Sequence, residues 1–192
     1  MKQAPMEMLG DNPEELFDLI DLDDQVIGIV RRSAAHSDPG LIHRSVQVMV
    51  FDSSGRVLLQ KRSASKDLFA GYYCASASGH VAAGEDYAAT AIRECGEELG
   101  LTLSLAYIGK ELVRSVYETE MTALFLGRSD GPFTFHPIET AGGDFFLLAE
   151  LKSYRTGAVA PGIPMTPALG VALDAIFRLA EERVLDQLLS EL

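Results

Sequence analysis

Three acidic residues in this chain have the spacing of neighbours on one face of a helix. Glu94, Glu97 and Glu98 stand at positions i, i+3 and i+4, whose side chains lie side by side on a helix. Adjacent carboxylates repel each other unless a cation lies between them, and hard ions such as Mg²⁺ and Mn²⁺ bind carboxylate oxygens. We therefore interpret the three acids as a divalent metal site rather than as a solvated helix face.

The residues on either side of the acids predict the helix that must position them. Residues 84–86, Gly-Glu-Asp, offer turn and capping chemistry, with acidic groups at the positive end of the helix dipole. The alanine-rich residues 88–92 favour helix, and Gly100 is suited to the position just after a last turn. The three acids thus fall in the second half of one predicted helix.

This stretch, residues 79–101, resembles the Nudix box, G-x5-E-x7-R-E-U-x-E-E-x-G-U, in which U is an apolar residue. Every specified position has the expected residue type, and Cys95 occupies one of the aliphatic positions. The resemblance implies an α/β (α+β) fold, namely an α/β/α sandwich with a mixed β-sheet. In such a fold a loop and the helix hold a metal ion against a diphosphate.

The same resemblance implies roles for individual residues. Glu94, Glu97 and Glu98 are expected to bind the metal. Glu85 and Arg93 are expected to form a supporting ion pair that orients the helix. Gly79 is expected to be a structural residue ahead of it.

Length, charge and cysteine content agree with one intracellular enzyme domain. The chain has 192 residues, a formal net charge of −12 and two cysteines, and no run of eighteen apolar residues. We expect no membrane span, no secretion signal and a cytoplasmic location, since two cysteines make no disulfide framework. The negative charge argues against nucleic acid as a partner. We predict a lead at residues 1–20, a Nudix domain at 21–160 and a C-terminal helical region at 161–192.

Apolar patterning predicts the elements around the box. Strands are expected at residues 25–32, 45–52, 57–62, 101–114, 121–126 and 145–148, followed by a short helix near 149–153. Beyond a Pro- and Gly-rich linker at 161–167, apolar residues recur at helical spacing from Leu169 to Leu188. We interpret this stripe as core packing, with a homodimer seam as the alternative.

A second group of residues combines imidazoles and carboxylates. His36 and His43 flank a Ser-Asp-Pro-Gly turn, and His80 lies within the box. Glu118 and Glu120 stand two residues apart, so that both point from the same face of a strand. Such a set suits Mn²⁺, Zn²⁺ or another first-row ion better than Mg²⁺ alone.

These segments, with residues 61–66, resemble the type 1 isopentenyl-diphosphate isomerases, Nudix-fold enzymes that move a double bond in a five-carbon diphosphate. The resemblance covers most of residues 25–150 and implies two sets of site residues. The metal ligands would be His36, His43, His80, Glu118 and Glu120. The cations that hold the diphosphate would be Arg32, Arg62 and Lys66, of which arginine can grip two oxygens at once.

The chain departs from the isomerase pattern in three respects. Ser78 stands where the isomerases have their acid/base cysteine, and a hydroxyl is a much weaker acid than a thiol. Cys74 lies four residues upstream and is a poor replacement. The chain has no tryptophan to face a developing cation, which leaves Phe145 or Phe146. Finally, it keeps all three box acids, which the isomerases usually lose.

We therefore predict a Mg²⁺- or Mn²⁺-dependent hydrolase of a small-molecule diphosphate. Glu98 or Glu120 would orient the attacking water, and the metal ions would polarise the phosphoryl oxygens. Glu97 and Ser78 complete the predicted catalytic set. The alternative is an isomerase of prenyl diphosphates in which Glu120 is the remaining proton carrier. A binding module without catalysis is the third hypothesis, and the retained box acids argue against it.

Overall fold

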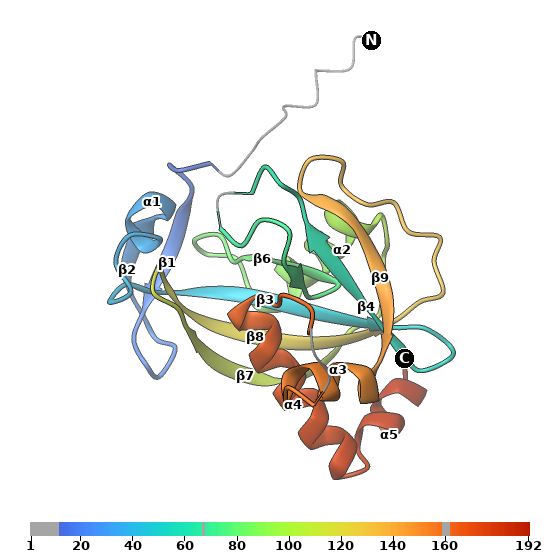
Figure 1. The fold of residues 1–192 in the computed structure, drawn as a ribbon. Coiled ribbons are helices and arrows are strands. Elements are labelled where there is room, and N and C mark those ends of the chain that lie inside the picture. The colour runs from blue at the N-terminus through green and yellow to red at the C-terminus, as the bar shows by residue number, and fades with distance from the viewer. Residues whose placement is uncertain (1–11, 67, 159–161) are drawn as a thin grey trace, which may run out of the picture.

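The computed structural model describes residues 12–66, 68–158 and 162–192. Figure 1 shows a large twisted sheet with helices on both faces. The elements, in chain order, are β1 (Leu16–Ile20), β2 (Val26–Arg31), α1 (Arg32–Ala35), β3 (Ile42–Phe51), β4 (Arg56–Arg62), β5 (Tyr73–Cys74), β6 (Ala77–His80), α2 (Tyr87–Leu99), β7 (Ala106–Arg114), β8 (Thr119–Arg128), β9 (Thr140–Leu147), α3 (Leu148–Arg155), α4 (Pro167–Glu181) and α5 (Leu185–Ser190).

Strand β3 is the centre of the sheet. It pairs in parallel with β8 along its whole length and antiparallel with β6, so the sheet is mixed, as predicted. Strands β1 and β2 extend the sheet beyond one end of β3, and the β4–β9 pair lies at its other end. Residues 42–51 are almost continuously buried, which explains the long apolar run that predicts this strand.

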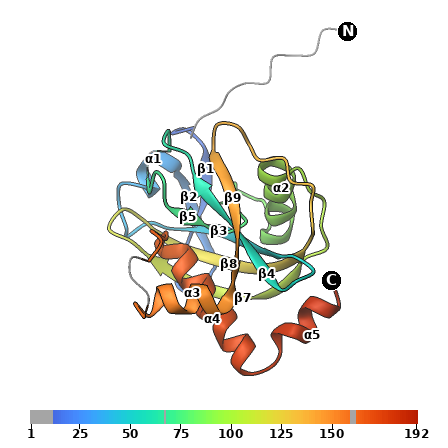
Figure 2. The same cartoon turned by 45° about the vertical axis from the view of Figure 1, so that its right-hand side comes forward.

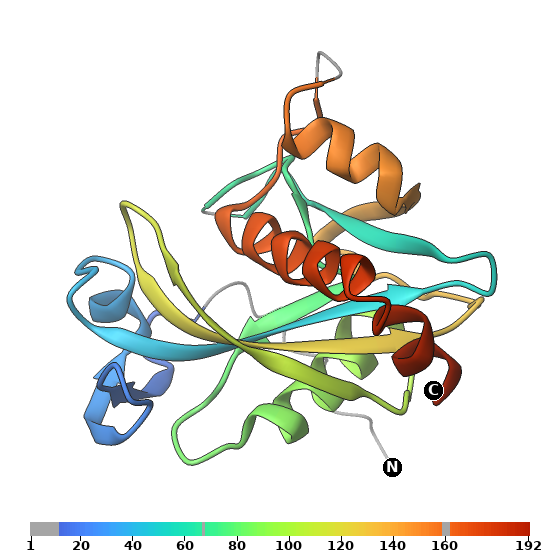
Figure 3. The same cartoon turned by 90° about the horizontal axis from the view of Figure 1, so that it is seen from below.

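The alternating residues of β3 enter two separate cores, one on each face. Val46 and Val48 pack against α2, whereas Met49 and Phe51 pack against α4. Figures 2 and 3 show α2 on one face of the sheet and α3 and α4 on the other. The expected α/β/α sandwich is therefore confirmed.

The C-terminal apolar stripe is core. Leu169, Leu173 and Ile176 of α4 are fully buried against the sheet, which decides against a dimer seam along this stripe. The helical pattern is divided between α4 and α5, because the backbone at Arg183 takes a left-handed conformation with φ of 61°. None of the helices in the described part of the chain has the length and apolarity that a bilayer span requires.

Two expectations about strands need correction. Residues 101–105 are not a strand, because their alternating leucines pack into the core beside α2 without pairing to a neighbour. The predicted N-terminal lead contains β1, which pairs with both β2 and β3. Residues 1–11 of that lead lie outside the described part of the chain.

Candidate active and metal site

A cavity of about 240 Å³ brings together both groups of predicted residues. Strand β6 lies between the groups, with Ser78, Gly79 and His80 all facing the cavity. The other predicted residues that line it are Arg32, His36, Arg62, Lys66, Glu94, Glu98, Glu118 and Glu120. Segments far apart in the sequence therefore form one site.

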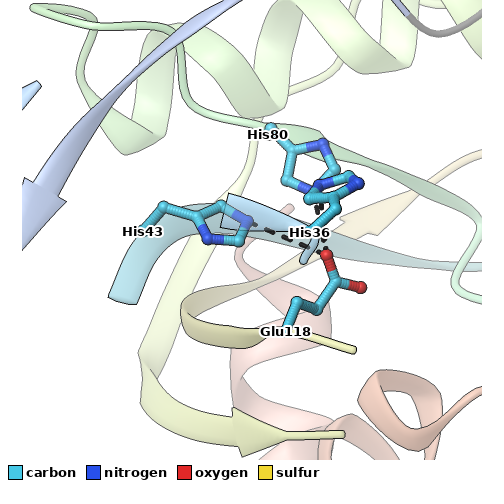
Figure 4. A group of neighbouring side chains, drawn as sticks. All are labelled: His36, His43, His80 and Glu118. Atoms are coloured by element: carbon cyan, nitrogen blue, oxygen red, sulfur yellow. Dashed lines mark hydrogen bonds and ion pairs between the residues drawn. The ribbon is translucent and has the colours of Figure 1, made fainter. Parts of the chain in front are cut away.

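Four side chains from four different segments converge on one another (Figure 4). His36, His80 and Glu118 line the cavity, whereas His43 is fully buried. His36 follows α1, His43 lies in β3, His80 ends β6 and Glu118 precedes β8. One ligand atom from each lies within 4.8 Å of all the others. The Glu118 Oε2 atom is 3.1 Å from His36 Nε2 and 3.9 Å from the Nε2 atoms of His43 and His80.

Unpartnered atoms in this group fit a bound cation. Both ring nitrogens of His43 and the Oε2 atom of Glu118 are buried and form no hydrogen bond. A buried polar atom without a hydrogen bond destabilises the fold by about 1–3 kcal/mol, and a metal ion would bind the Glu118 Oε2 atom and one ring nitrogen of His43. The donor set of three imidazoles and a carboxylate suits a first-row divalent ion.

Electrostatics keep two of the imidazoles in the form that binds metal. Burial, reinforced by the charge of His80, lowers the pKa of both His36 and His43 to about 4. Burial also disfavours the charged form of His80, but the carboxylates of Glu118 and Glu120 outweigh it and raise the pKa of His80 to about 9. In the metal-free protein, His80 therefore carries the proton that a bound cation would replace.

Glu120 borders this group without belonging to the four convergent ligands. Its Oε1 atom lies 3.4 Å from His80 Nε2, and it is the direct neighbour of His43 in the parallel β3–β8 register. Burial opposes its ionisation, but His80 outweighs this effect and lowers the pKa of Glu120 to about 2. Its predicted roles as ligand and proton carrier stay predictions.

The box helix begins and ends as its sequence predicts. The side chain of Asp86 accepts a hydrogen bond of 2.9 Å from the Ala89 N–H, which caps the first turn of α2. Gly100 ends the helix with a φ of 68°, a left-handed conformation that glycine adopts without strain. These local features place the carboxylates of the helix at the cavity.

Two of the three box acids face the cavity. Glu94 and Glu98 are each 8% exposed, and burial raises the pKa of Glu94 to about 7 and that of Glu98 to about 8. Glu98 accepts hydrogen bonds from the Ser78 N–H at 2.8 Å and from Gln60 Nε2 at 3.1 Å. A cation between the two carboxylates would offset their burial and mutual repulsion.

Glu97 has a different environment. Its side chain is 58% exposed and lies 3.0 Å from Arg93 Nη1. Successive residues of a helix are rotated by about 100°, so Glu97 and Glu98 cannot both point directly into the cavity. The structure therefore does not gather Glu97 with Glu94 and Glu98, and its predicted roles stay untested.

Arg93 binds three carboxylates at once. The predicted ion pair with Glu85 is present at 3.2 Å, and Arg93 also lies 2.8 Å from Glu94. Burial opposes the charge of the guanidinium, but these carboxylates raise its pKa above the usual value. Arg93 thus connects the loop before α2 to the acids on the helix, as the Nudix resemblance implies.

Gly79 allows the close approach of β6 to α2. A methyl group at this position would lie 2.9 Å from Glu94 Cγ and still closer to the Glu94 carboxylate. Any larger residue would therefore displace Glu94 from the cavity wall. This contact explains why the position before His80 needs a glycine.

The three predicted phosphate-binding cations have acidic or backbone partners at the cavity. Arg32 lies 3.1 Å from Glu15 and 3.2 Å from His80 Nδ1. Arg62 donates to the Leu68 carbonyl oxygen at 3.1 Å. All three of these cations line the cavity together with the carboxylates.

Three further polar residues lie at or next to the cavity, and the sequence did not predict them. Glu139 reaches the cavity from the loop before β9 and lies 3.4 Å from Lys66, and nothing in the sequence indicates this placement. Gln47 lines the cavity opposite Ser78, and Gln60 holds Glu98. Each glutamine lies next to apolar residues of its strand, and this was the available signal.

Phe145 and Phe146, the residues left to replace the missing tryptophan, do not line the cavity. Among the described residues that line it, Phe69 is the only aromatic ring other than the histidines; Phe145 packs against Phe133 and Phe146 against Tyr73. Cys74 does border the cavity, but burial raises the pKa of its thiol to about 12, so the thiol stays protonated. Ser78 faces the cavity between the two acidic groups.

Comparisons with known proteins show the family and agree with the fold. The model of the NUDIX domain family matches residues 41–168. An isopentenyl-diphosphate Delta-isomerase of Nocardia farcinica is 30% identical over 167 residues, covering 84% of this chain and 95% of that protein. The isopentenyl-diphosphate Delta-isomerase of Burkholderia multivorans is 35% identical over 147 residues, covering 74% of this chain and 77% of that protein.

Solved structures resemble the fold. DR0079 from Deinococcus radiodurans aligns with a TM-score of 0.68 and 24% identity, covering 85% of this chain and 98% of that one. The MutT protein of Methanosarcina mazei Go1 aligns with a TM-score of 0.60 and 19% identity, covering 74% of this chain and 95% of that one. At these identities the similarity concerns the fold alone.

Proposed function

The chain belongs to the Nudix family, and from this premise we propose that it is a divalent-cation-dependent enzyme acting on a small diphosphate ester. Its first candidate reaction is the isomerisation of isopentenyl diphosphate. The observation that carries this proposal is the convergence of His36, His43, His80 and Glu118, in which His43 is buried without a hydrogen bond and the other three line the cavity together with Arg32. The relatives named isopentenyl-diphosphate Delta-isomerase support isomerisation over the hydrolysis that the sequence favoured.

Two kinds of residue in the cavity would act on the diphosphate, namely cationic side chains and metal ligands. Arg32, Arg62 and Lys66 bind the diphosphate oxygens through charge-assisted hydrogen bonds. His36, His43, His80 and Glu118 would hold a divalent cation, which would neutralise negative charge on the diphosphate.

Isomerisation adds one proton to the terminal alkene carbon and removes one from the carbon nearer the diphosphate. Glu120 lies beside the His–Glu group and is our candidate for one of these transfers. Ser78 lies at the position from which the other transfer would come, and its weakly acidic hydroxyl predicts a slow reaction.

Hydrolysis is the second candidate, and one specific observation favours it. Glu94 and Glu98 are buried in the same cavity, and the Ser78 N–H holds the Glu98 carboxylate 2.8 Å away. These carboxylates would hold a cation at the phosphoryl oxygens, and Glu98 would orient a water molecule toward the phosphorus atom. Cleavage would give a phosphate monoester and inorganic phosphate.

One experiment tests both candidates on the same protein. Isopentenyl diphosphate is incubated in D₂O with Mg²⁺ or Mn²⁺, and NMR follows both deuterated dimethylallyl diphosphate and inorganic phosphate. Isomerisation predicts deuterated product without phosphate and a faster rate in Ser78→Cys. Hydrolysis predicts phosphate release, from this ester or from a panel of other diphosphates, that falls by at least an order of magnitude in Glu98→Gln.

The control is Glu182→Gln, which makes the same chemical change at the exposed end of α4. It should leave either activity unchanged. If neither product forms from any diphosphate with either cation, the proposed function is wrong. If His43→Ala turns over at the wild-type rate, the His–Glu group is not the cation site of the reaction.

A further inference from the structure

Strand β2 has an outer edge that pairs with no other strand in the described part of the chain. Its inner edge pairs antiparallel with β1, with a bulge at Ile27. Val26 is 51% exposed, and Ile27 and Ile29 are each 63% exposed. Soluble proteins usually protect such an edge with charges, proline or a covering segment, because exposed backbone groups and apolar side chains bind other strands.

The exposed apolar surface extends over the whole β1–β2 hairpin. Leu16 is 46% exposed and Leu22 is 62% exposed. Together with the three residues of β2, they are five of the eleven large apolar side chains that the described residues expose. An apolar surface gathered on one hairpin indicates an interaction site rather than scattered surface residues.

We propose that this edge binds the same edge of a second copy of the chain, in an antiparallel pair with a two-fold axis at Gly28. The sequence of residues 26–30, Val-Ile-Gly-Ile-Val, reads the same in both directions. A two-fold interface must be complementary to itself, and this strand meets that condition. Ile27 would lie opposite the partner's Ile29, and the bulge at Ile27 would displace Val26 from the regular position opposite the partner's Val30.

The charges at the two ends of the strand support a second copy as the partner. Asp21 and Asp23 lie just before β2, and Arg31 is its last residue. In the antiparallel pair, Arg31 would lie near the turn that precedes the partner's β2 and carries Asp21 and Asp23. Opposite charges at such cross-strand positions stabilise the pair, whereas a parallel pair would place like charges together.

This interface would also connect to the active site through the chain. The residue after β2 is Arg32, which lines the cavity, and α1 leads from it to His36. The inference nevertheless does not depend on the proposed reaction. Its evidence is the exposure, symmetry and charge pattern of the hairpin alone.

A cysteine at the two-fold axis tests the arrangement directly. Directly opposite residues of an antiparallel pair have Cα atoms about 4.5–5.5 Å apart, within the range of about 4.4–6.8 Å that a disulfide needs. A Cβ atom at Gly28 would meet Leu19 Cδ2 at 3.7 Å, an ordinary contact, so Gly28→Cys fits the fold. The native cysteines, Cys74 and Cys95, are buried.

Under mild oxidation, Gly28→Cys should become mostly a disulfide-linked dimer on a non-reducing gel. The control is Val116→Cys, whose position is 82% exposed on the β7–β8 turn and lies outside the proposed interface. It should stay mostly monomeric. Equal cross-linking of the two variants would overturn the proposal.

Light scattering after size exclusion gives an independent test. The wild type should have twice the 20.8 kDa mass of the chain. The double variant Ile27→Lys, Ile29→Lys should have the monomer mass with an unchanged circular-dichroism spectrum, because both side chains are exposed. Ile92→Lys, at an exposed position of α2, should keep the wild-type mass. A monomeric wild type, or a dimeric double variant, would also refute the proposal.

Discussion

Replacing Gly79 with alanine tests the close contact between β6 and α2 on which the acidic wall of the cavity depends. The new methyl group would lie 2.9 Å from Glu94 Cγ and closer to its carboxylate. Glu94 is only 8% exposed and its Oε1 atom lies 2.8 Å from Arg93 Nη1, so it cannot move away without breaking that contact. Gly79→Ala should therefore lower stability.

Overpacking of this kind typically lowers the free energy of unfolding by about 1–3 kcal/mol. For a chain of this size, each kcal/mol corresponds to a fall of about 2–4 °C in the melting temperature. We expect Gly79→Ala to lose several degrees in thermal unfolding at pH 7.5 with EDTA.

A double-mutant cycle identifies the clash as the cause. In the Glu94→Ala background the obstructing side chain is absent, so Gly79→Ala should then change the unfolding free energy by less than about 0.5 kcal/mol. The control is Gly96→Ala, on α2, where the nearest atom to a new Cβ is 3.9 Å away and no clash arises. If the losses of Gly79→Ala and Glu94→Ala simply add, the close approach is not what requires glycine.

Three further predictions concern ions and protons. Saturating Mn²⁺ should raise the melting temperature of the wild type, because a ligand at one hundred times its Kd adds about 2.7 kcal/mol to the free energy of unfolding. The melting temperature of His43→Ala should rise much less. In the metal-free protein, Glu94 and Glu98 bind protons more tightly in the folded than in the unfolded state, so their contribution to stability in urea is lost as pH rises from about 4.5 to about 8. The lowered pKa values of His36 and His43 act in the opposite direction up to about pH 6.5, so the net loss of stability is expected above that pH. Glu98→Gln should reduce this loss, and an unchanged loss would contradict the raised pKa of Glu98. For the enzymatic reaction, Glu97→Gln should reduce kcat less than Glu98→Gln, since Glu97 faces solvent; equal losses would place Glu97 at the reacting groups.

The sequence was sufficient for features that depend on residues close together in the chain. Asp86 and Gly100 mark the ends of α2, because capping and left-handed turns involve only neighbouring backbone groups. The Glu85–Arg93 ion pair, the acids on α2 and the apolar stripe of α4 also followed from local spacing and family pattern. The names of the relatives then favoured isomerisation over hydrolysis as the proposed reaction.

The tertiary structure alone decided which residues meet. The sequence could name His36, His43 and Glu118 only through a family pattern, because the distances among them depend on the pairing of β3 with β6 and β8. It could not show that Glu97 faces solvent or that Glu139 reaches the cavity. Capping and helical periodicity act over a few residues, whereas strand register and loop placement are fixed by packing between segments that are distant along the chain.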